Sequence, residues 1–323
     1  MADTLDNLSI NTLAGPLIDR LLTDAAQLRL GISRLDNGTT IIDGGINSRG
    51  GLEAGVAITE LCLAGLGRVR ISQDGPLDGW RNQIEVATSQ PVLACLGCQY
   101  AGWSLSHKDP KFYALGSGPG RVLAGKEELI KELGLTDRSD RTALVVETDK
   151  VPPAALADRV AESCGIAADA LTLVLTPTGS LAGLVQVVGR VVEVALHKAH
   201  ALHFPLDRIV DALGSAPLPP PTRDGLAAMG RTNDAILFGG RVQLIVDADE
   251  TEAEQLARQL PSSASNDYGK PFAKVFKDYN YDFFQVDPML FSPAEVSVTV
   301  LGSGRTFRAG RLDPALIDQS FND

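Results

Sequence analysis

The residues best suited to chemistry lie in an apolar segment that carries only three polar side chains. Residues 181–196 read LAGLVQVVGRVVEVAL, and the three are Gln186, Arg190 and Glu193. Their spacing of four and then three residues places them on one face of an α-helix, where Arg190 and Glu193 can meet directly. A charged side chain on so apolar a helix requires a partner, a cavity or a function.

The residues alone leave two interpretations of this polar face open. In the first, a narrow face of a core helix meets solvent, and Arg190 and Glu193 form an incidental ion pair. In the second, the face lines a cleft, where Glu193 acts as a general base or acid. Burial raises the pKa of a carboxyl group and a neighbouring guanidinium lowers it, and such opposed effects are typical of sites of proton chemistry.

Metal binding is a third possibility, because His197, His200 and His203 follow the polar face at three-residue spacing. A helix turns about 100° per residue, so the three imidazoles would not converge from one straight helix. Cys95 and Cys98 form a CxxC pair without a second pair or a thioredoxin-like context. We therefore expect small buried thiols in an apolar strand and turn, and no metal ion.

Composition places further bounds on function. The 323 residues suffice for one large or two ordinary domains, and 44% of them are hydrophobic. The 40 acidic residues exceed the 29 basic ones, and the net charge of −11 argues against nucleic acid or an anionic membrane as the main partner. The chain lacks an uninterrupted apolar run of membrane-spanning length, and residues 1–12 lack the basic and then apolar order of a signal peptide. We expect a cytoplasmic protein.

Helical and strand patterns alternate along the first two thirds of the chain. Pro205 sets the end of the last of these helices, because the residue before a proline disfavours helical backbone. We expect strands at 39–45, 68–74, 91–97, 142–148 and 170–178, and helices at 12–30, 52–64, 122–133, 152–164 and 181–204.

The C-terminal part has a more hairpin-like pattern. Residues 215–225 contain a proline triplet and predict a rigid surface connector, whereas 233–249 predict a hairpin or a long bent strand that turns at Gly239-Gly240. A helix is expected at 249–260, and strands at 296–302 and 305–310.

These patterns favour a mixed α/β (α+β) fold in two domains over one doubly wound sheet. Residues 1–90 with 246–323 would form the first α/β domain, to which the C-terminal strands return, and residues 91–245 would form the second. The sequence leaves these boundaries open by tens of residues.

Two glycine-rich loops each connect a strand to a helix. They read DGGINSRGG at residues 43–51 and GSGPGR at residues 116–121. This arrangement presents backbone N–H groups to anions, although the first loop lacks the common phosphate-binding patterns. A tight connection explains it equally well.

Five motifs occur in an order that resembles one protein family. They are GSGPGR, the VGRVVE helix, NDAILFGG, PSSASNDYGKPF and DFFQVDPMLFSPA. In this order they resemble the methenyltetrahydromethanopterin cyclohydrolases, and the resemblance runs from the GGINSRGGLEAG loop to the PMLFSPAEV strand. It implies a two-domain α/β subunit with a large pocket between the domains, assembled as a homotrimer. It also implies one-carbon metabolism on a tetrahydromethanopterin-type carrier, a step used in methylotrophy and methanogenesis.

The resemblance implies that Arg190 and Glu193 are the catalytic pair. The methenyl carbon of the substrate is part of a delocalised cation, so a carboxylate that takes a proton from the attacking water would assist hydrolysis to the N5-formyl product. Glu193 would be this base, and Arg190 would orient it. No cofactor is implied, because the carrier is itself the substrate. The residues expected to contact substrate are Gln186, Asp234 beside the Gly239-Gly240 turn, Ser263, Ser265, Asp267 and Lys270.

Two alternatives from other functional classes stay open. One is a non-catalytic pterin-binding or assembly protein that kept the fold. The other is a formyl transferase on the same carrier, which would need a second substrate pocket.

Overall fold

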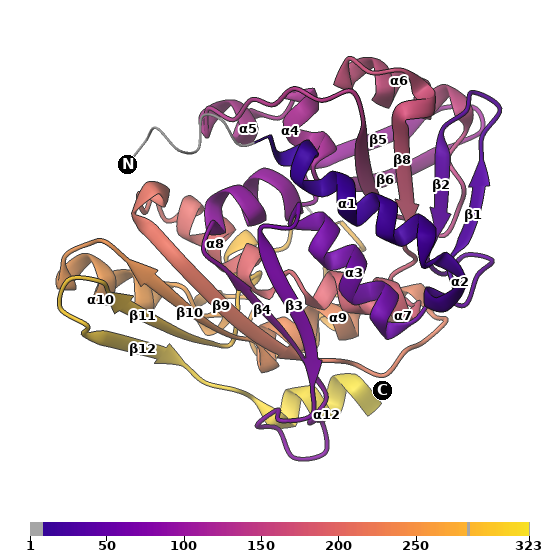
Figure 1. Ribbon diagram of the computed structural model, residues 1–323. Helices are drawn as coiled ribbons and strands as arrows, with labels where there is room; N and C mark the ends of the chain where they lie inside the picture. The colour runs from indigo at the N-terminus through magenta and orange to yellow at the C-terminus, as the bar shows by residue number, and fades with distance from the viewer. Residues whose placement is uncertain (1–8, 283–284, 323) are drawn as a thin grey trace. The chain divides into compact units, whose positions relative to one another are not determined.

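The chain folds into two compact units, each with one six-stranded sheet (Figure 1). The computed structural model describes residues 9–282 and 285–322. The first unit comprises residues 1–67 and 93–183, and the second comprises residues 68–92 and 184–323. Helices and mixed sheets in both units confirm the predicted α+β class.

The grouping of segments differs from the one expected. Residues 68–92 do share a unit with 246–323, but residues 184–245 join them rather than residues 91–183. The reason is strand pairing, since the strands at 209–217 and 241–246 connect the early and late strands of the second sheet.

The first sheet has a parallel centre that is buried on both faces. Its strands, in spatial order, are β1 (Gly31–Arg34), β2 (Thr40–Asp43), β8 (Leu171–Leu175), β7 (Thr142–Glu147), β6 (Phe112–Ser117) and β5 (Trp103–His107). β2, β8 and β7 are parallel to one another, and their near-continuous apolar runs are typical of strands covered on both sides.

Short helices cover this sheet. They are α1 (Ile10–Thr23), α2 (Ala25–Leu28), α3 (Leu52–Cys62), α4 (Gly120–Ala124), α5 (Glu128–Glu132) and α6 (Ala154–Cys164). The helix expected at 12–30 is thus two helices. So is the one expected at 122–133, because Gly125 ends α4 in the left-handed conformation with φ 58°.

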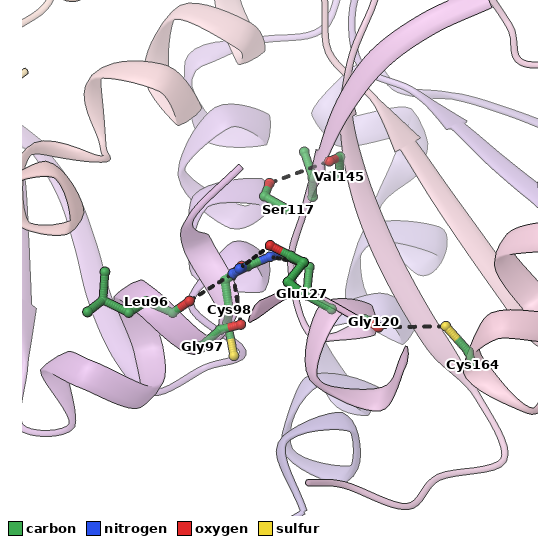
Figure 2. A network of polar contacts seen from close by, with 9 residues as sticks. Leu96, Gly97, Cys98, Ser117, Gly120, Glu127, Val145 and Cys164 are labelled. Atoms are coloured by element: carbon green, nitrogen blue, oxygen red, sulfur yellow. Dashed lines mark hydrogen bonds and ion pairs between the residues drawn. The ribbon is translucent and has the colours of Figure 1, made fainter. Parts of the chain in front are cut away.

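The strand expected at 91–97 is wrong, because Val92–Gln99 forms a π-helix. Arg121 supplies hydrogen-bond donors to the backbone carbonyls at the C-terminal end of this helix. Its Nη1 donates to the carbonyls of Leu96 and Gly97, both at 2.9 Å, and to that of Cys98 at 3.3 Å (Figure 2). Carbonyls at a helix C-terminus lack intrahelical partners, and a cation there is favourable.

The CxxC thiols lie within this π-helix. Cys95 and Cys98 are buried, as predicted, but in helix rather than in a strand and turn. Burial raises the pKa of Cys98 to about 12, so its thiol stays protonated and unreactive at neutral pH.

The first glycine loop is organised by its own carboxylate. Asp43 accepts the backbone N–H groups of Gly45, Ile46, Asn47 and Ser48 at 2.6–3.0 Å. Burial opposes ionisation, but these four bonds together hold the pKa of Asp43 below its ordinary value. These four N–H groups of the loop are therefore already occupied by an anion that the chain provides.

The second sheet is mostly antiparallel. Its strands, in spatial order, are β12 (Thr306–Gly310), β11 (Glu295–Val300), β10 (Arg241–Val246), β9 (Ile209–Pro217), β4 (Gln83–Thr88) and β3 (Gly67–Ser72). β10 and β11 run parallel, and both alternate between buried and half-buried residues, so one face of the sheet carries the core.

Three helices pack against this sheet: α8 (Val191–Ala201), α9 (Gly225–Gly239) and α10 (Glu250–Gln259). Two more, α11 (Phe272–Asp278) and α12 (Pro314–Asn322), pack against α9. α10 confirms the helix expected at 249–260, and Asp249 and Glu252 form a capping box at its start.

Two predictions in this region are wrong. Residues 233–239 lie in α9 instead of a hairpin, because a short apolar run suits a buried helix as well as a strand. The expected surface connector begins as strand, since β9 continues to Pro217 and residues 216–219 are buried.

Some features named from the sequence lie outside the described residues. These are most of the polar N-terminal segment and Phe283 and Phe284 of the DFFQVDPMLFSPA motif. Within the described ranges, no helix has the length and apolar character needed to cross a membrane.

Candidate functional site

The apolar segment is two helices and not one. α7 (Leu181–Val188) ends before Gly189, and α8 starts at Val191. Arg190 caps α8 with φ −82° and ψ 7°, and its N–H bonds to the carbonyl of Val187, three residues back, at 3.1 Å. This backbone region is sparsely populated and is common among active-site residues, and glycine is a usual site of a helix break.

The three polar residues beside this break are all buried. Gln186 is 1% exposed, Glu193 3% and Arg190 8%. The interpretation in which a narrow helix face meets solvent therefore loses its basis. Two ionisable groups have been placed where an uncompensated charge is costly, which favours a functional role.

A hydrogen bond orients the amide of Gln186. Arg190 donates from Nη2 to Gln186 Oε1 at 3.1 Å. Turning the amide over would set two donors against each other, so the oxygen must face Arg190. The other end, Nε2, is buried and has no acceptor among the described residues. A buried donor left unsatisfied costs about 1–3 kcal/mol, so this site is incomplete without an added acceptor.

Glu193 occupies the first turn of α8. The N-terminal end of a helix dipole stabilises negative charge, so this position suits an ionised carboxylate. α8 is held close to the sheet, because a Cβ at Gly214 of β9 would lie 2.9 Å from Cγ2 of Val192. Sheet packing thus sets the position of the helix that carries Glu193.

Asp234 has a different location from the one expected. It lies within α9, away from any hairpin turn, and is fully buried. Its Oδ1 accepts the N–H of Phe272 at 2.8 Å and its Oδ2 accepts the Ser320 hydroxyl at 2.6 Å. Burial raises the pKa of Asp234 to about 7, against the effect of these bonds. The side chain joins α9, α11 and α12.

Ser265 and Asp267 meet in a network around Asp287. Ser265 donates its hydroxyl to Asp287 Oδ2 at 2.7 Å, and Asp267 Oδ2 accepts the N–H of Asp287 at 2.8 Å. Asp267 Oδ1 accepts the hydroxyl of Tyr279, also at 2.8 Å. Both predicted contact residues are thus engaged within the segment and give it its shape.

Ser263 and Lys270 are the exposed members of the predicted set. Lys270 is 60% exposed and pairs with Asp278 at 2.7 Å. Exposed ion pairs of this kind contribute little to stability, so this lysine is available to a ligand.

Sequence reasoning missed Lys198. This residue of α8 is 1% exposed, and its ammonium group donates to the carbonyls of Pro261 at 2.8 Å and Met289 at 2.7 Å. Burial lowers its pKa to about 8, and the charge of Asp287 opposes that shift. The signal was present, because a lysine in so apolar a helix raises the same question as Arg190.

The three histidines in and after α8 give no metal cluster. Across residues 9–282 and 285–322, no group of three His, Cys, Asp or Glu side chains is placed to hold a metal ion. His203 is exposed, and burial together with the charge of His200 lowers the pKa of His197.

A groove of about 630 Å³ also lies in the second unit. It covers the face of the sheet opposite the buried one, and its lining includes Arg68, Glu85, Arg241 and Glu295. Because α8 and the polar residues at the helix break belong to the other face, the groove is separate from them.

Comparison with known proteins places the whole described chain in one family. The family model Cyclohydrolase (MCH) matches residues 9–321. A Methenyltetrahydromethanopterin cyclohydrolase of Methylobacillus flagellatus is 56% identical over 313 residues, covering 97% of this chain and 95% of the relative. Relatives of the same name from Methylobacterium organophilum and Methanothermobacter marburgensis are 54% and 42% identical, over 97% of this chain and 97% and 99% of their own lengths.

Proposed function

Since the chain belongs to the Cyclohydrolase (MCH) family, we propose that it hydrolyses 5,10-methenyl-tetrahydromethanopterin, or its dephospho form, to the N5-formyl compound. The relatives that carry this activity in their names cover nearly the entire chain, in bacteria and in an archaeon. The reaction belongs to one-carbon metabolism and fits the methylotrophy implied above.

The chemistry needs a base more than it needs a metal. The methenyl carbon bridges two nitrogens and shares their positive charge, so it is already electrophilic. Water adds to this carbon, its proton passes to a base, and one C–N bond then breaks as the nitrogen regains a proton. A positioned base contributes about 10²–10⁴-fold to such a step. We expect no cofactor.

Glu193 is the proposed base, and the buried polar residues at the α7–α8 break are the observation that carries the proposal. Its carboxylate would take the water proton and stabilise the cationic substrate. Arg190, fixed by Gln186, would orient the carboxylate. The free amide N–H of Gln186 would donate to a carbonyl or ring nitrogen of the pterin.

The remaining predicted residues divide by accessibility. Ser263 and Lys270 are exposed and are proposed to contact the carrier. Ser265 and Asp267 would act by shaping the segment that presents these contacts. Asp234 is proposed to support the same region from beneath, by anchoring the first residue of α11.

The alternatives have weaker support. A pterin-binding or assembly protein has no use for a buried carboxylate in the first turn of a helix. A formyl transferase would bind a second substrate, and the described residues offer no feature that favours one. The homotrimer, the pocket between domains and the cytoplasmic location stay predictions.

The decay of methenyl-pterin absorbance tests the assignment. Glu193→Gln should lose at least about 10²-fold in kcat, the lower end for a lost general base. Arg190→Ala should lose activity as well. Glu254→Gln, a matched change at a 44% exposed glutamate of α10, should leave turnover unchanged. Near-normal turnover by Glu193→Gln would remove Glu193 from the mechanism.

A further inference from the structure

Lys198 connects one helix to two separate stretches of chain. Its ammonium group bonds the carbonyl of Pro261 and the carbonyl of Met289, which stand near the two ends of the polar segment 261–289. Both bonds are short, and the side chain that makes them is buried. One charge on α8 therefore holds both ends of the segment.

The other bonds at these ends lead elsewhere. Ser262 donates its hydroxyl to the carbonyl of Leu237 on α9, and its N–H bonds to the carbonyl of Pro293 at 2.9 Å. Ser292 donates to the carbonyl of Leu260. These bonds close the segment on itself and on α9, whereas Lys198 connects it to α8.

We propose that Lys198 is a positioning residue, which fixes the polar segment 261–289 on the helix that carries Glu193. Substrate contacts on the segment, such as Ser263 and Lys270, then keep a constant place relative to the catalytic carboxylate. The statement that the segment binds substrate rests on the proposed function. The attachment of the segment to α8 by Lys198 does not depend on that function.

The choice of a buried lysine supports positioning over simple stabilisation. Well-packed hydrophobic residues often replace buried charges without loss of stability, so burial of an ammonium group is a poor way to stabilise a fold. An ammonium group instead offers three donors in fixed directions, and charge-assisted bonds to carbonyls are about twice as strong as neutral ones. The carboxylate of Asp287 at the N-cap of the 288–290 turn adds attraction from the segment's side.

Two measurements on Lys198→Met test the proposal. Amide hydrogen exchange should quicken across residues 262–282 and 285–289 while β10 and β11 stay protected. KM should rise about tenfold, the effect of one lost charge-assisted bond, while kcat stays within about threefold. Lys198→Arg, which keeps the charge and the donors, should restore much of the exchange protection and most of the affinity that KM reports. Lys277→Met, an exposed lysine of α11 in the same segment, should match the wild type.

Each outcome decides the matter. Wild-type exchange and KM in Lys198→Met would overturn the proposal, and so would a fall in kcat at constant KM. If Lys198→Met does not fold, Lys198→Gln retains a neutral donor group and should show the same changes in exchange and KM at smaller size. If the wild type fails to hydrolyse the methenyl-pterin, the proposed function fails while the exchange measurement still decides the role of Lys198.

Discussion

Two buried arginines of this chain have opposite surroundings. In the first unit, Arg121 donates to three carbonyls and, from Nε and Nη2, to both carboxylate oxygens of Glu127 at 2.7 Å (Figure 2). In the second unit, Arg190 bonds a glutamine whose own amide N–H has no acceptor among the described residues. The first cluster is complete by itself, and the second is completed only by something added.

This difference separates structure from function without reference to sequence similarity. A fully bonded buried charge fixes a fold, and here it ends a π-helix. A polar cluster that leaves a donor unsatisfied carries a cost that a ligand can remove. The comparison therefore predicts that changes at Arg121 act on stability and that changes beside Arg190 act on kcat or KM.

The largest expected effect is on the complete cluster. Arg121→Met removes the cation that pairs with Glu127 and binds the carbonyls of Leu96 and Gly97, so it should lower the free energy of unfolding by about 3–5 kcal/mol. Urea denaturation measures this. Arg70→Met, which removes an exposed partner of Glu85, should cost no more than about 1 kcal/mol. Equal losses of unfolding free energy in the two variants would contradict the structural role given to the Arg121 cluster.

Asp234 is a buried carboxyl group whose two oxygens both accept hydrogen bonds, although burial disfavours its ionised form. Burial raises its pKa from an ordinary 3.8 to about 7, so between these values the folded chain holds a proton that the unfolded chain has released. The contribution of Asp234 to stability is therefore greatest below this window and falls as pH rises through it, by on the order of 4 kcal/mol.

The Asp234→Asn variant isolates this effect. It can still accept the N–H of Phe272, so its unfolding free energy should show a much smaller fall between pH 4 and pH 7 than the wild type. Thermal unfolding across this range measures the difference. Parallel pH curves for the two proteins would show that Asp234 is ionised throughout.

A smaller effect is expected at the unsatisfied amide. Gln186→Glu keeps an acceptor for Arg190 but removes the free donor, so KM for the methenyl-pterin should rise about tenfold, the equivalent of one hydrogen bond of 1.4 kcal/mol. Gln243→Glu, on the opposite face of the sheet, is the matched control and should leave KM unchanged. A wild-type KM in Gln186→Glu would show that this amide does not meet the substrate.

The sequence singled out the candidate site residues but not the shape of the chain around them. Gln186, Arg190 and Glu193 were singled out because polar residues are conspicuous in an apolar helix, whereas their burial, which the sequence left open, came from the structure. The break at Gly189 was not predicted, because one glycine is tolerated in most helices. Lys198 lies two residues beyond the apolar segment 181–196, and the same reasoning applied to a longer segment identifies it.

The errors elsewhere have one physical origin. Residues 92–99 and 233–239 are short apolar runs that suit strand and helix alike. The choice between them depends on partners distant in sequence, such as Arg121 for the π-helix and Ser320 for Asp234 of α9. Single-sequence periodicity does not contain these contacts. Elements with a local signal, such as the capping box of α10, were predicted correctly.

The most direct test makes the same substitution in both clusters. Glu127→Gln should lower the unfolding free energy by about 1.5–3 kcal/mol, because it removes charge-assisted bonds, and should retain kcat. Glu193→Gln should lose at least about 10²-fold in kcat and unfold at a free energy close to that of the wild type. Measured side by side, this crossed pattern is the predicted result. A loss of stability without loss of kcat in Glu193→Gln would contradict the account.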